Sequence, residues 1–200
     1  MSNSIVASAA RPRQTQQEID ARSLRLIWID CEMSGLDVNT KHLLEVACMV
    51  TEGDSSLQIV AKAPDLIIHQ PEEVLNEMDE WSMVQHAKSG LTDEVRKSSL
   101  TLEQAEEQLY QFLKLYTPEG KCPLAGNTCG RDRVFLEKYM PKLANHLHYR
   151  NVDVSSFKEM YRRICPHVLQ SLPLKTRGHR ALEDIEASRK EMLHYIRHLF

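Results

Sequence analysis

The chain has 200 residues, which suits one domain with short extensions and is long enough to bury a sizeable core. With 42% hydrophobic and 26% charged residues, it has the composition of a soluble globular protein, and its longest apolar runs are too short to cross a membrane. Its formal net charge of −3 disfavours a protein that coats long nucleic acid with a broad basic face, although an enzyme with a small pocket remains compatible.

The first 24 residues differ in composition from the rest. They contain Arg11 and Arg13 and no acidic residue before Glu18, which leaves two interpretations: a mitochondrial presequence or a flexible tail. The 5 cysteines form no CxxC pair, so they indicate free thiols in a reducing compartment. We therefore expect an intracellular protein, mitochondrial or cytoplasmic, with a tail over residues 1–24.

The first half of the remaining chain predicts strands and then helices. Apolar runs at residues 26–29 and 43–51 predict two buried strands, and residues 58–63 and 66–69 complete an antiparallel meander. Residues 71–86 then predict a helix that ends before Gly90.

A clearer helix is predicted over residues 101–116, where Thr101 and Gln104 match a capping box. Residues 123–126 predict a short buried strand, and residues 134–140 a helix that stops at Pro141. These elements begin the alternation of strand and helix that fills the second half of the chain.

The last elements are a strand at residues 152–154, a helix capped by Ser156 and Glu159, and a helix over residues 180–199. The apolar stripe expected on this last helix consists of Leu182, Ile185, Met192, Ile196 and Leu199. The succession predicts an α/β domain with a mixed five-stranded sheet flanked by helices, whose ligands gather at strand ends.

The chemically informative residues fall at such ends. Asp30 and Glu32 stand two apart at the end of the first predicted strand, so both point to one face. Two carboxylates in close contact repel each other unless cations neutralise them, and a divalent ion with oxygen ligands does so. Alone, such a pair is more typical of a solvated surface.

Three further residues extend this pair in a consistent order. Asp132 follows the fourth predicted strand, and His179 and Asp184 stand at the start of the last helix. Each has an ordinary alternative: Asp132 as a helix N-cap, His179 as a solvated loop residue, and Glu183 as an equally available carboxylate beside Asp184. Their joint order and spacing favour one shared site.

This set of five, Asp30, Glu32, Asp132, His179 and Asp184, resembles the three exonuclease motifs of the DEDDh superfamily, which has an RNase H-like fold. Longer matching stretches narrow the resemblance to the oligoribonuclease family. These stretches are residues 28–37 (WIDCEMSGLD), 86–91 (HAKSGL), 123–127 (PLAGN), 146–150 (HLHYR), 152–155 (VDVS) and 179–182 (HRAL). The resemblance covers about residues 25–199 and implies one exonuclease domain over residues 25–200.

The resemblance implies a catalytic site with two Mg²⁺ or Mn²⁺ ions, held by the four carboxylates Asp30, Glu32, Asp132 and Asp184. It also implies that His179 removes a proton from the attacking water, because imidazole suits a base at neutral pH. The expected reaction is 3′→5′ hydrolysis of short single-stranded RNA, especially dinucleotides, to 5′-mononucleotides.

The resemblance further implies a capped pocket in a homodimer. Leu36 would wedge against a base, Trp81 and His86 would line the 3′ end, and Tyr149 would stack from the partner subunit. The 5′ phosphate would be contacted by three residues, Thr128, Arg150 and Ser155. Without the family, packing roles for Leu36, Trp81 and Tyr149 are the simpler interpretations.

Two positions depart from the family pattern. Cys31 stands where leucine is usual and points away from the site, and Thr128 stands where serine is common but keeps the hydroxyl. The competing interpretations are a DEDDh exonuclease that trims longer DNA or RNA, and a catalytically silent nucleic-acid-binding module. No function is assigned to residues 165–177.

Overall fold

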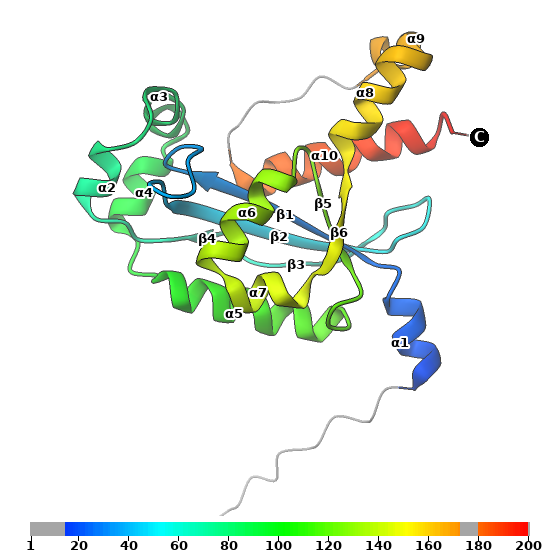
Figure 1. Ribbon diagram of the computed structural model, residues 1–200, viewed down its shortest axis with the longest axis horizontal. Helices are drawn as coiled ribbons and strands as arrows, with labels where there is room; N and C mark the ends of the chain where they lie inside the picture. Colours follow the sequence, from blue (N-terminus) through cyan, green and yellow to red (C-terminus); the bar gives the residue numbers. More distant parts are fainter. Residues whose placement is uncertain (1–14, 173–179, 200) are drawn as a thin grey trace, which may run out of the picture.

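A computed structural model of the chain describes residues 15–172 and 180–199 (Figure 1). The strands are β1 (Leu26–Met33), β2 (Leu43–Thr51), β3 (Ile59–Lys62), β4 (Leu66–Ile67), β5 (Pro123–Gly126) and β6 (His148–Asp153). The helices are α1 (Gln16–Arg22), α2 (Glu72–Asn76), α3 (Glu80–Ser89), α4 (Leu91–Lys97), α5 (Leu102–Tyr116), α6 (Gly130–Tyr139), α7 (Pro141–His146), α8 (Val154–Ile164), α9 (Pro166–Gln170) and α10 (Ala181–Ile196).

All strands join one mixed sheet in the order β3-β2-β1-β5-β6, with β4 also pairing β2. β1 and β2 are antiparallel, whereas β5 runs parallel to both β1 and β6. The α/β fold with a mixed sheet is confirmed, but it has 6 strands rather than five. The prediction counts the runs at residues 58–63 and 66–69 as one strand, whereas they form the separate strands β3 and β4 on either side of Pro64, which cannot donate a backbone hydrogen bond to a ladder.

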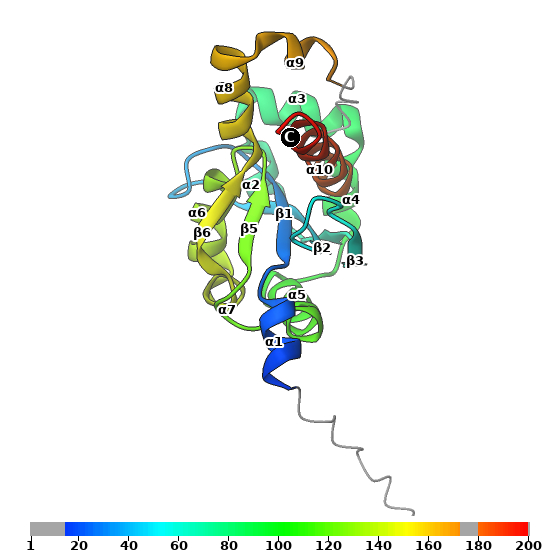
Figure 2. The same cartoon turned by 90° about the vertical axis from the view of Figure 1, so that its right-hand side faces the viewer.

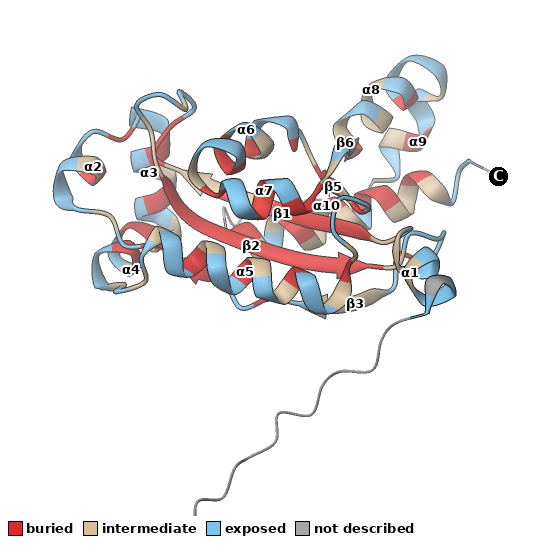
Figure 3. Ribbon diagram, turned by 60° about the horizontal axis from the view of Figure 1, so that its bottom comes forward, coloured by how far each residue is buried: buried red, intermediate tan, exposed pale blue. Residues whose placement is uncertain are grey.

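Helices cover both faces of the sheet (Figures 1 and 2). Alternate residues of β1 supply the two cores: Ile27 and Ile29 pack with α5, α6 and α7, and Trp28 packs with α8 and α10. β2, at the centre of this packing, is buried along its whole length (Figure 3). The same alternation carries Asp30 and Glu32 to the α10 face, which is why their carboxylates can meet a residue of α10.

α10 buries a face that is partly polar. Ala181, Ile185 and Tyr195 are buried in the apolar core, and Ser188 and Glu191 are buried among them. Of the expected stripe, Ile185 and Met192 are buried, whereas Leu182 and Ile196 are half-buried and Leu199 is exposed. Two polar side chains on the buried side require partners, and those partners lie close to the candidate site.

The single helix predicted over residues 71–86 is wrong. The chain forms α2 and α3, separated at Asp79, whose backbone N–H donates to the Ser34 carbonyl. The Asp79 carboxylate also pairs with Lys41 and accepts the Leu36 N–H. These contacts hold the loop after β1, where a Cβ at position 35 would lie 2.2 Å from an Asp79 oxygen and would displace the Asp79 carboxylate from its contacts.

Two predicted helix starts are also corrected. α6 begins at Gly130, so Asp132 lies in its first turn and is not its N-cap. α8 begins at Val154 with Asp153 as its N-cap, so Ser156 and Glu159 do not form the expected capping box. By contrast, the capping box at the start of α5 is confirmed.

Part of the expected tail is helical. Residues 16–22 form α1, which has its own capping box of Thr15 and Glu18. Arg22 and Arg25 donate to the Tyr116 carbonyl and thereby tie this segment to the end of α5. Residues 1–14 lie outside the described part. Among the residues that the structure does describe, no helix combines the length and the apolar character needed to cross a membrane.

Candidate active site

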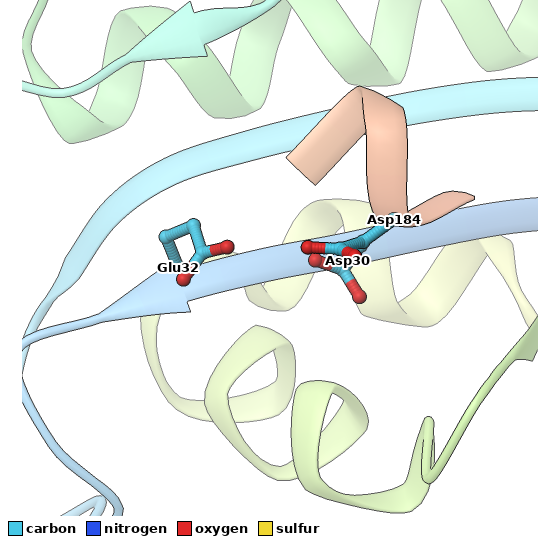
Figure 4. A group of neighbouring side chains, drawn as sticks. All are labelled: Asp30, Glu32 and Asp184. Atoms are coloured by element: carbon cyan, nitrogen blue, oxygen red, sulfur yellow. The ribbon is translucent and has the colours of Figure 1, made fainter. Parts of the chain in front are cut away.

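Three carboxylates meet between β1 and α10 (Figure 4). Asp30 and Glu32 project from β1, and Asp184 comes from the first turn of α10. Each offers one oxygen, and these oxygens lie within 4.8 Å of one another. Glu183, the alternative carboxylate, is exposed and does not belong to this group.

The start of α10 is held by an ion-pair network that we call the Arg180 clamp, made of Arg180, Glu45 and Glu94. Glu45 lies opposite Glu32 in the β1–β2 pairing and is completely buried. Arg180 donates to Glu45 at 3.0 Å and to Glu94 at 2.9 Å. A second Glu45 oxygen accepts the Ala181 backbone N–H at 3.2 Å. The clamp thus fixes the first turn of α10, and with it Asp184, against the sheet.

Asp132 lies beside the three carboxylates but does not join them. Its buried carboxylate accepts the Cys31 backbone N–H at 3.0 Å, beyond the point where β5 stops pairing with β1. The Cys31 side chain packs into the core on the other face of the sheet, as expected. Asp132 therefore holds the end of β1 through the Cys31 backbone, and its negative charge adds to that of the neighbouring carboxylates.

The group carries more negative charge than its burial tolerates. Burial raises the pKa of Asp30 well above its ordinary range, and the nearby Asp132, Glu32 and Asp184 raise it further. Burial, with repulsion from Asp184 and Glu45, raises the pKa of Glu32 to about 8. Burial raises the pKa of Asp132 to about 7, although its hydrogen bond from Cys31 opposes the change. Clustered carboxylate oxygens of this kind fit a hard divalent cation.

His179 lies outside the described residues. Arg180, the next residue, is placed by the clamp at the N-terminus of α10. The described chain resumes at Arg180, beside the carboxylate group, and the role expected of His179 stays a prediction.

Two hydroxyls lie side by side where β5 and β6 end. The Thr128 and Ser155 hydroxyl oxygens are 3.1 Å apart, and one Asp153 oxygen accepts both of their backbone N–H groups at 2.9 Å. Thr128 has φ of +58°, a conformation that β-branched residues rarely adopt, so the surrounding contacts must hold it. Arg150, also predicted to contact phosphate, is exposed on β6.

The alternative interpretation of Leu36, Trp81 and Tyr149 as packing residues is wrong. Leu36, Trp81 and Tyr149 are 62%, 61% and 73% exposed, so none is a core residue. His86 is buried instead: its Nε2 lies 2.9 Å from the Met33 carbonyl oxygen, and its Nδ1 lies 3.9 Å from Glu32. Their expected contacts with substrate stay predictions, and His86 is placed to support Glu32.

The sequence prediction assigned no role to Glu45, Glu94 or Arg180. Glu45 does carry a signal, because it is a lone charge within the apolar run LLEVACMV and therefore needs a buried partner. Nothing in the sequence identifies that partner, since Arg180 lies 135 residues away.

Comparison with known proteins agrees with this geometry. A family model described as an exonuclease matches residues 27–192. The chain is 46% identical to human mitochondrial oligoribonuclease over 181 residues, covering 90% of this chain and 76% of that protein. It is 46% identical to a probable oligoribonuclease of Dictyostelium discoideum, covering 92% and 95% of the two chains. With the oligoribonuclease of Marinobacter nauticus the identity is 48%, covering 88% and 96%.

Solved structures show the same fold. A structure of exonuclease I superposes with a TM-score of 0.66 at 12% identity, covering 87% of this chain and 41% of that one. The cell-death related nuclease CRN-4 gives a TM-score of 0.62 at 14% identity, covering 87% and 64%. The architecture is thus the RNase H-like exonuclease fold. On the family match and the extent of these identities, the chain belongs to the oligoribonuclease family of exonucleases.

Proposed function

We propose that this protein is a metal-dependent 3′→5′ exoribonuclease that hydrolyses short single-stranded RNA, above all dinucleotides, to 5′-mononucleotides. The observation that carries the proposal is the group Asp30, Glu32 and Asp184, assembled from two distant segments in a chain similar to oligoribonucleases. The exonuclease match supports hydrolysis of a phosphodiester as the reaction that this group would serve.

In this proposal Asp30, Glu32, Asp132 and Asp184 hold two divalent ions, Mg²⁺ or Mn²⁺. Four carboxylates balance two such charges, which would relieve the repulsion that raises the pKa of Glu32. When bound, divalent ions supply an acidified water and an electrophilic environment for the phosphate. The protein's own contribution is to fix these four carboxylates on three elements: β1, the first turn of α6 and the clamped start of α10.

We assign the general base to His179, whose imidazole nitrogen would accept the proton of the attacking water. The water oxygen forms a bond to phosphorus as the bond to the leaving 3′ oxygen breaks, and that oxygen is protonated on departure. The Arg180 clamp supports this assignment because it fixes the residue that follows His179 at the edge of the carboxylate group.

We place substrate against residues on both sides of this group. Leu36 and Trp81 offer exposed apolar surface for the terminal bases, and His86 supports their end of the site. Thr128, Arg150 and Ser155 would bind the 5′ phosphate, and Tyr149 would reach the partner's site in a homodimer. A phosphate bound in this way closes the site to longer strands.

The test is digestion of end-labelled RNAs of two to ten nucleotides with Mg²⁺ or Mn²⁺. We expect release of 5′-mononucleotides, with rates that drop steeply beyond two nucleotides. Equal rates across the series would indicate an exonuclease that trims longer strands. Binding without turnover under either metal would indicate a catalytically silent module.

We also propose an intracellular location, mitochondrial or cytoplasmic. The human relative is named as mitochondrial, whereas the names of the bacterial relatives carry no such term. Expression of the full chain with a C-terminal fluorescent tag distinguishes the compartments, and removal of residues 1–14 should redirect the protein only if that segment is a presequence.

A further inference from the structure

One face of α10 connects two parts of the site. Asp184, Ser188 and Glu191 are spaced at i, i+4 and i+7, so they project from the same side of the helix. Asp184 belongs to the carboxylate group, and Ser188 and Glu191 are buried further along. From Asp184 to Glu191 the helix rises about 10 Å. Figure 1 shows α10 as one unbroken helix along the sheet.

Asn127 is the residue that Ser188 and Glu191 hold. Its Nδ2 donates to the Ser188 hydroxyl at 2.8 Å and to Glu191 at 3.2 Å. Its Oδ1 accepts from the Ser155 hydroxyl at 3.0 Å. Because both ends of the amide are engaged, its orientation is fixed and it presents an acceptor to Ser155.

Glu191 is itself held by the buried Tyr195 and the half-buried Lys158. The Tyr195 hydroxyl donates to its other oxygen at 2.8 Å, and Lys158 lies 3.4 Å away. A buried carboxylate held by these contacts gives Asn127 a fixed, charge-assisted acceptor. The series Tyr195, Glu191, Asn127 and Ser155 is therefore a continuous hydrogen-bonded path from the core to the surface.

The path ends at the Thr128–Ser155 hydroxyl pair. Since Ser155 donates to Asn127, its oxygen is left to accept from Thr128, which is the more exposed of the two. When an anion binds, the Thr128 hydroxyl hydrogen can turn from Ser155 towards it, while Ser155 keeps its own hydrogen bond to Asn127 and so stays in place. The hydroxyl pair is thus ordered before any ligand arrives, which reduces the entropy lost on binding.

We propose that Asn127 and Glu191 are positioning residues that set substrate length, because through them α10 fixes the hydroxyl pair at a constant distance from the carboxylate group. The inference rests on the proposed function, in which this pair binds the 5′ phosphate. It assigns the choice of length to a buried polar path rather than to the surface residues alone. Neither Asn127 nor Glu191 touches substrate in this arrangement.

The first test compares dinucleotides with and without a 5′ phosphate. Hydrogen bonds to a charged group distinguish such substrates by about tenfold or more, so the unmodified protein should show that ratio of kcat/KM. In Asn127→Ala the ratio should fall several-fold, mainly through KM of the phosphorylated substrate, while the contact from Arg150 remains. The preference for two nucleotides over five should fall with it. General damage to the fold would lower kcat/KM for both substrates and leave the ratio in place.

The second test uses two stacked tyrosines as a matched pair. Tyr195 and Tyr161 have ring centroids 5.0 Å apart, and each buries a hydroxyl between α8 and α10. The Tyr195 hydroxyl bonds Glu191, whereas that of Tyr161 bonds a backbone carbonyl. Tyr195→Phe should therefore reduce the 5′-phosphate ratio several-fold, and Tyr161→Phe should leave it at the level of the unmodified protein.

The outcomes separate this inference from the proposed function. If the unmodified protein degrades RNA and prefers a 5′ phosphate, but Asn127→Ala and Tyr195→Phe keep that preference, the positioning role is wrong and the activity stands. An equal effect of both tyrosine substitutions also overturns it. If the unmodified protein degrades RNA equally well with and without a 5′ phosphate, the proposed selection of substrate length is wrong, although the proposed hydrolysis is retained. Absence of hydrolysis with either metal refutes the proposed function itself.

Discussion

At the scale of single residues, charge governs the site. Asp30, Glu32 and Asp184 share a small volume in which burial and mutual repulsion oppose ionisation. Such an arrangement is costly to fold and is kept where a cation compensates it. Two predictions follow from this charge.

Asp30→Asn or Asp184→Asn should abolish hydrolysis, because each removes an anionic ligand from a charge-balanced group. Glu183→Gln is the matched control, since Glu183 is adjacent to Asp184 but exposed and outside the group. Its turnover of a labelled dinucleotide should equal that of the unmodified protein. Chelation with EDTA should reproduce the loss, and turnover that persists in EDTA would refute metal dependence.

Divalent ions should stabilise the fold more at high pH. Burial and nearby carboxylates raise the pKa of Glu32 to about 8 in the folded chain, against an ordinary value of 4.5. Between these values the folded state holds more protons than the unfolded state, so the free energy of unfolding falls as pH rises. At high pH a bound cation offsets the repulsion between the ionised carboxylates. At low pH it must first displace protons from them, so it stabilises the fold less.

Thermal melting of the metal-free protein with and without Mg²⁺ measures this effect. At 100 times Kd a ligand adds about 2.7 kcal/mol, or roughly 5–10 °C for a chain of this size. We expect a shift of that order near pH 8 and a small one near pH 5.5. In Asp30→Asn the difference between the two pH values should shrink. An equal shift at both pH values in the unmodified protein would contradict the assignment.

At the scale of elements, the Arg180 clamp attaches α10 to β2. Glu45 is completely buried, and its charge is matched by Arg180. Removing one partner of a buried pair leaves an uncompensated charge, whereas removing both charges does not. The clamp therefore predicts that removing the Glu45 charge restores stability lost on removing Arg180, which would not happen if only a surface contact were lost.

Arg180→Met should lower the free energy of unfolding by about 3–5 kcal/mol and slow turnover, and adding Glu45→Gln should restore much of the stability. Arg163→Met is the control, because Arg163 is 64% exposed and pairs only on the surface of α8. Its change should stay within about 0.5 kcal/mol. Urea unfolding supplies all four values. If the double substitution is no more stable than Arg180→Met, the buried Glu45 charge is not what the clamp compensates.

At the scale of the whole molecule, β6 lies at one edge of the sheet and carries the exposed Tyr149. If Tyr149 and Arg150 serve the partner's site, each site in a dimer is composite. A His179→Ala chain, slowed by about 10²–10⁴, still donates an intact cap. A Tyr149→Ala/Arg150→Ala chain keeps its catalytic set.

Mixing these two weakly active chains should therefore restore activity. Random reassortment makes about half of the dimers mixed and about a quarter of all sites normal. Subunit exchange is followed with a mass tag on one chain. If tagged mixed dimers form and turnover of a dinucleotide stays at the level of the parents, Tyr149 and Arg150 act within their own chain.

Much of this protein follows from local sequence. The period of two in residues 26–32 places Asp30 and Glu32 on one face, and Thr101 and Gln104 mark the start of α5. Such features depend on neighbouring residues and on the preferences of backbone and side chain alone. The order of motifs was likewise sufficient to indicate the exonuclease family.

Other features depend on contacts between segments far apart in the chain. The helix predicted over residues 71–86 breaks because Asp79 bonds the loop after β1 through Ser34, Leu36 and Lys41. Helix propensity depends only on neighbouring residues, so it does not include the free energy gained from these long-range contacts.

The site itself shows the same division. The sequence alone determined which residue types are present and on which side of β1 two of them lie. Only the tertiary structure decided that Asp184 meets Asp30 and Glu32 in space, that Arg180 compensates Glu45, and that Asn127 connects α10 to Ser155. The physical reason is that a buried charge or amide selects its partner by position in space, and that position is set by the packing of the whole fold.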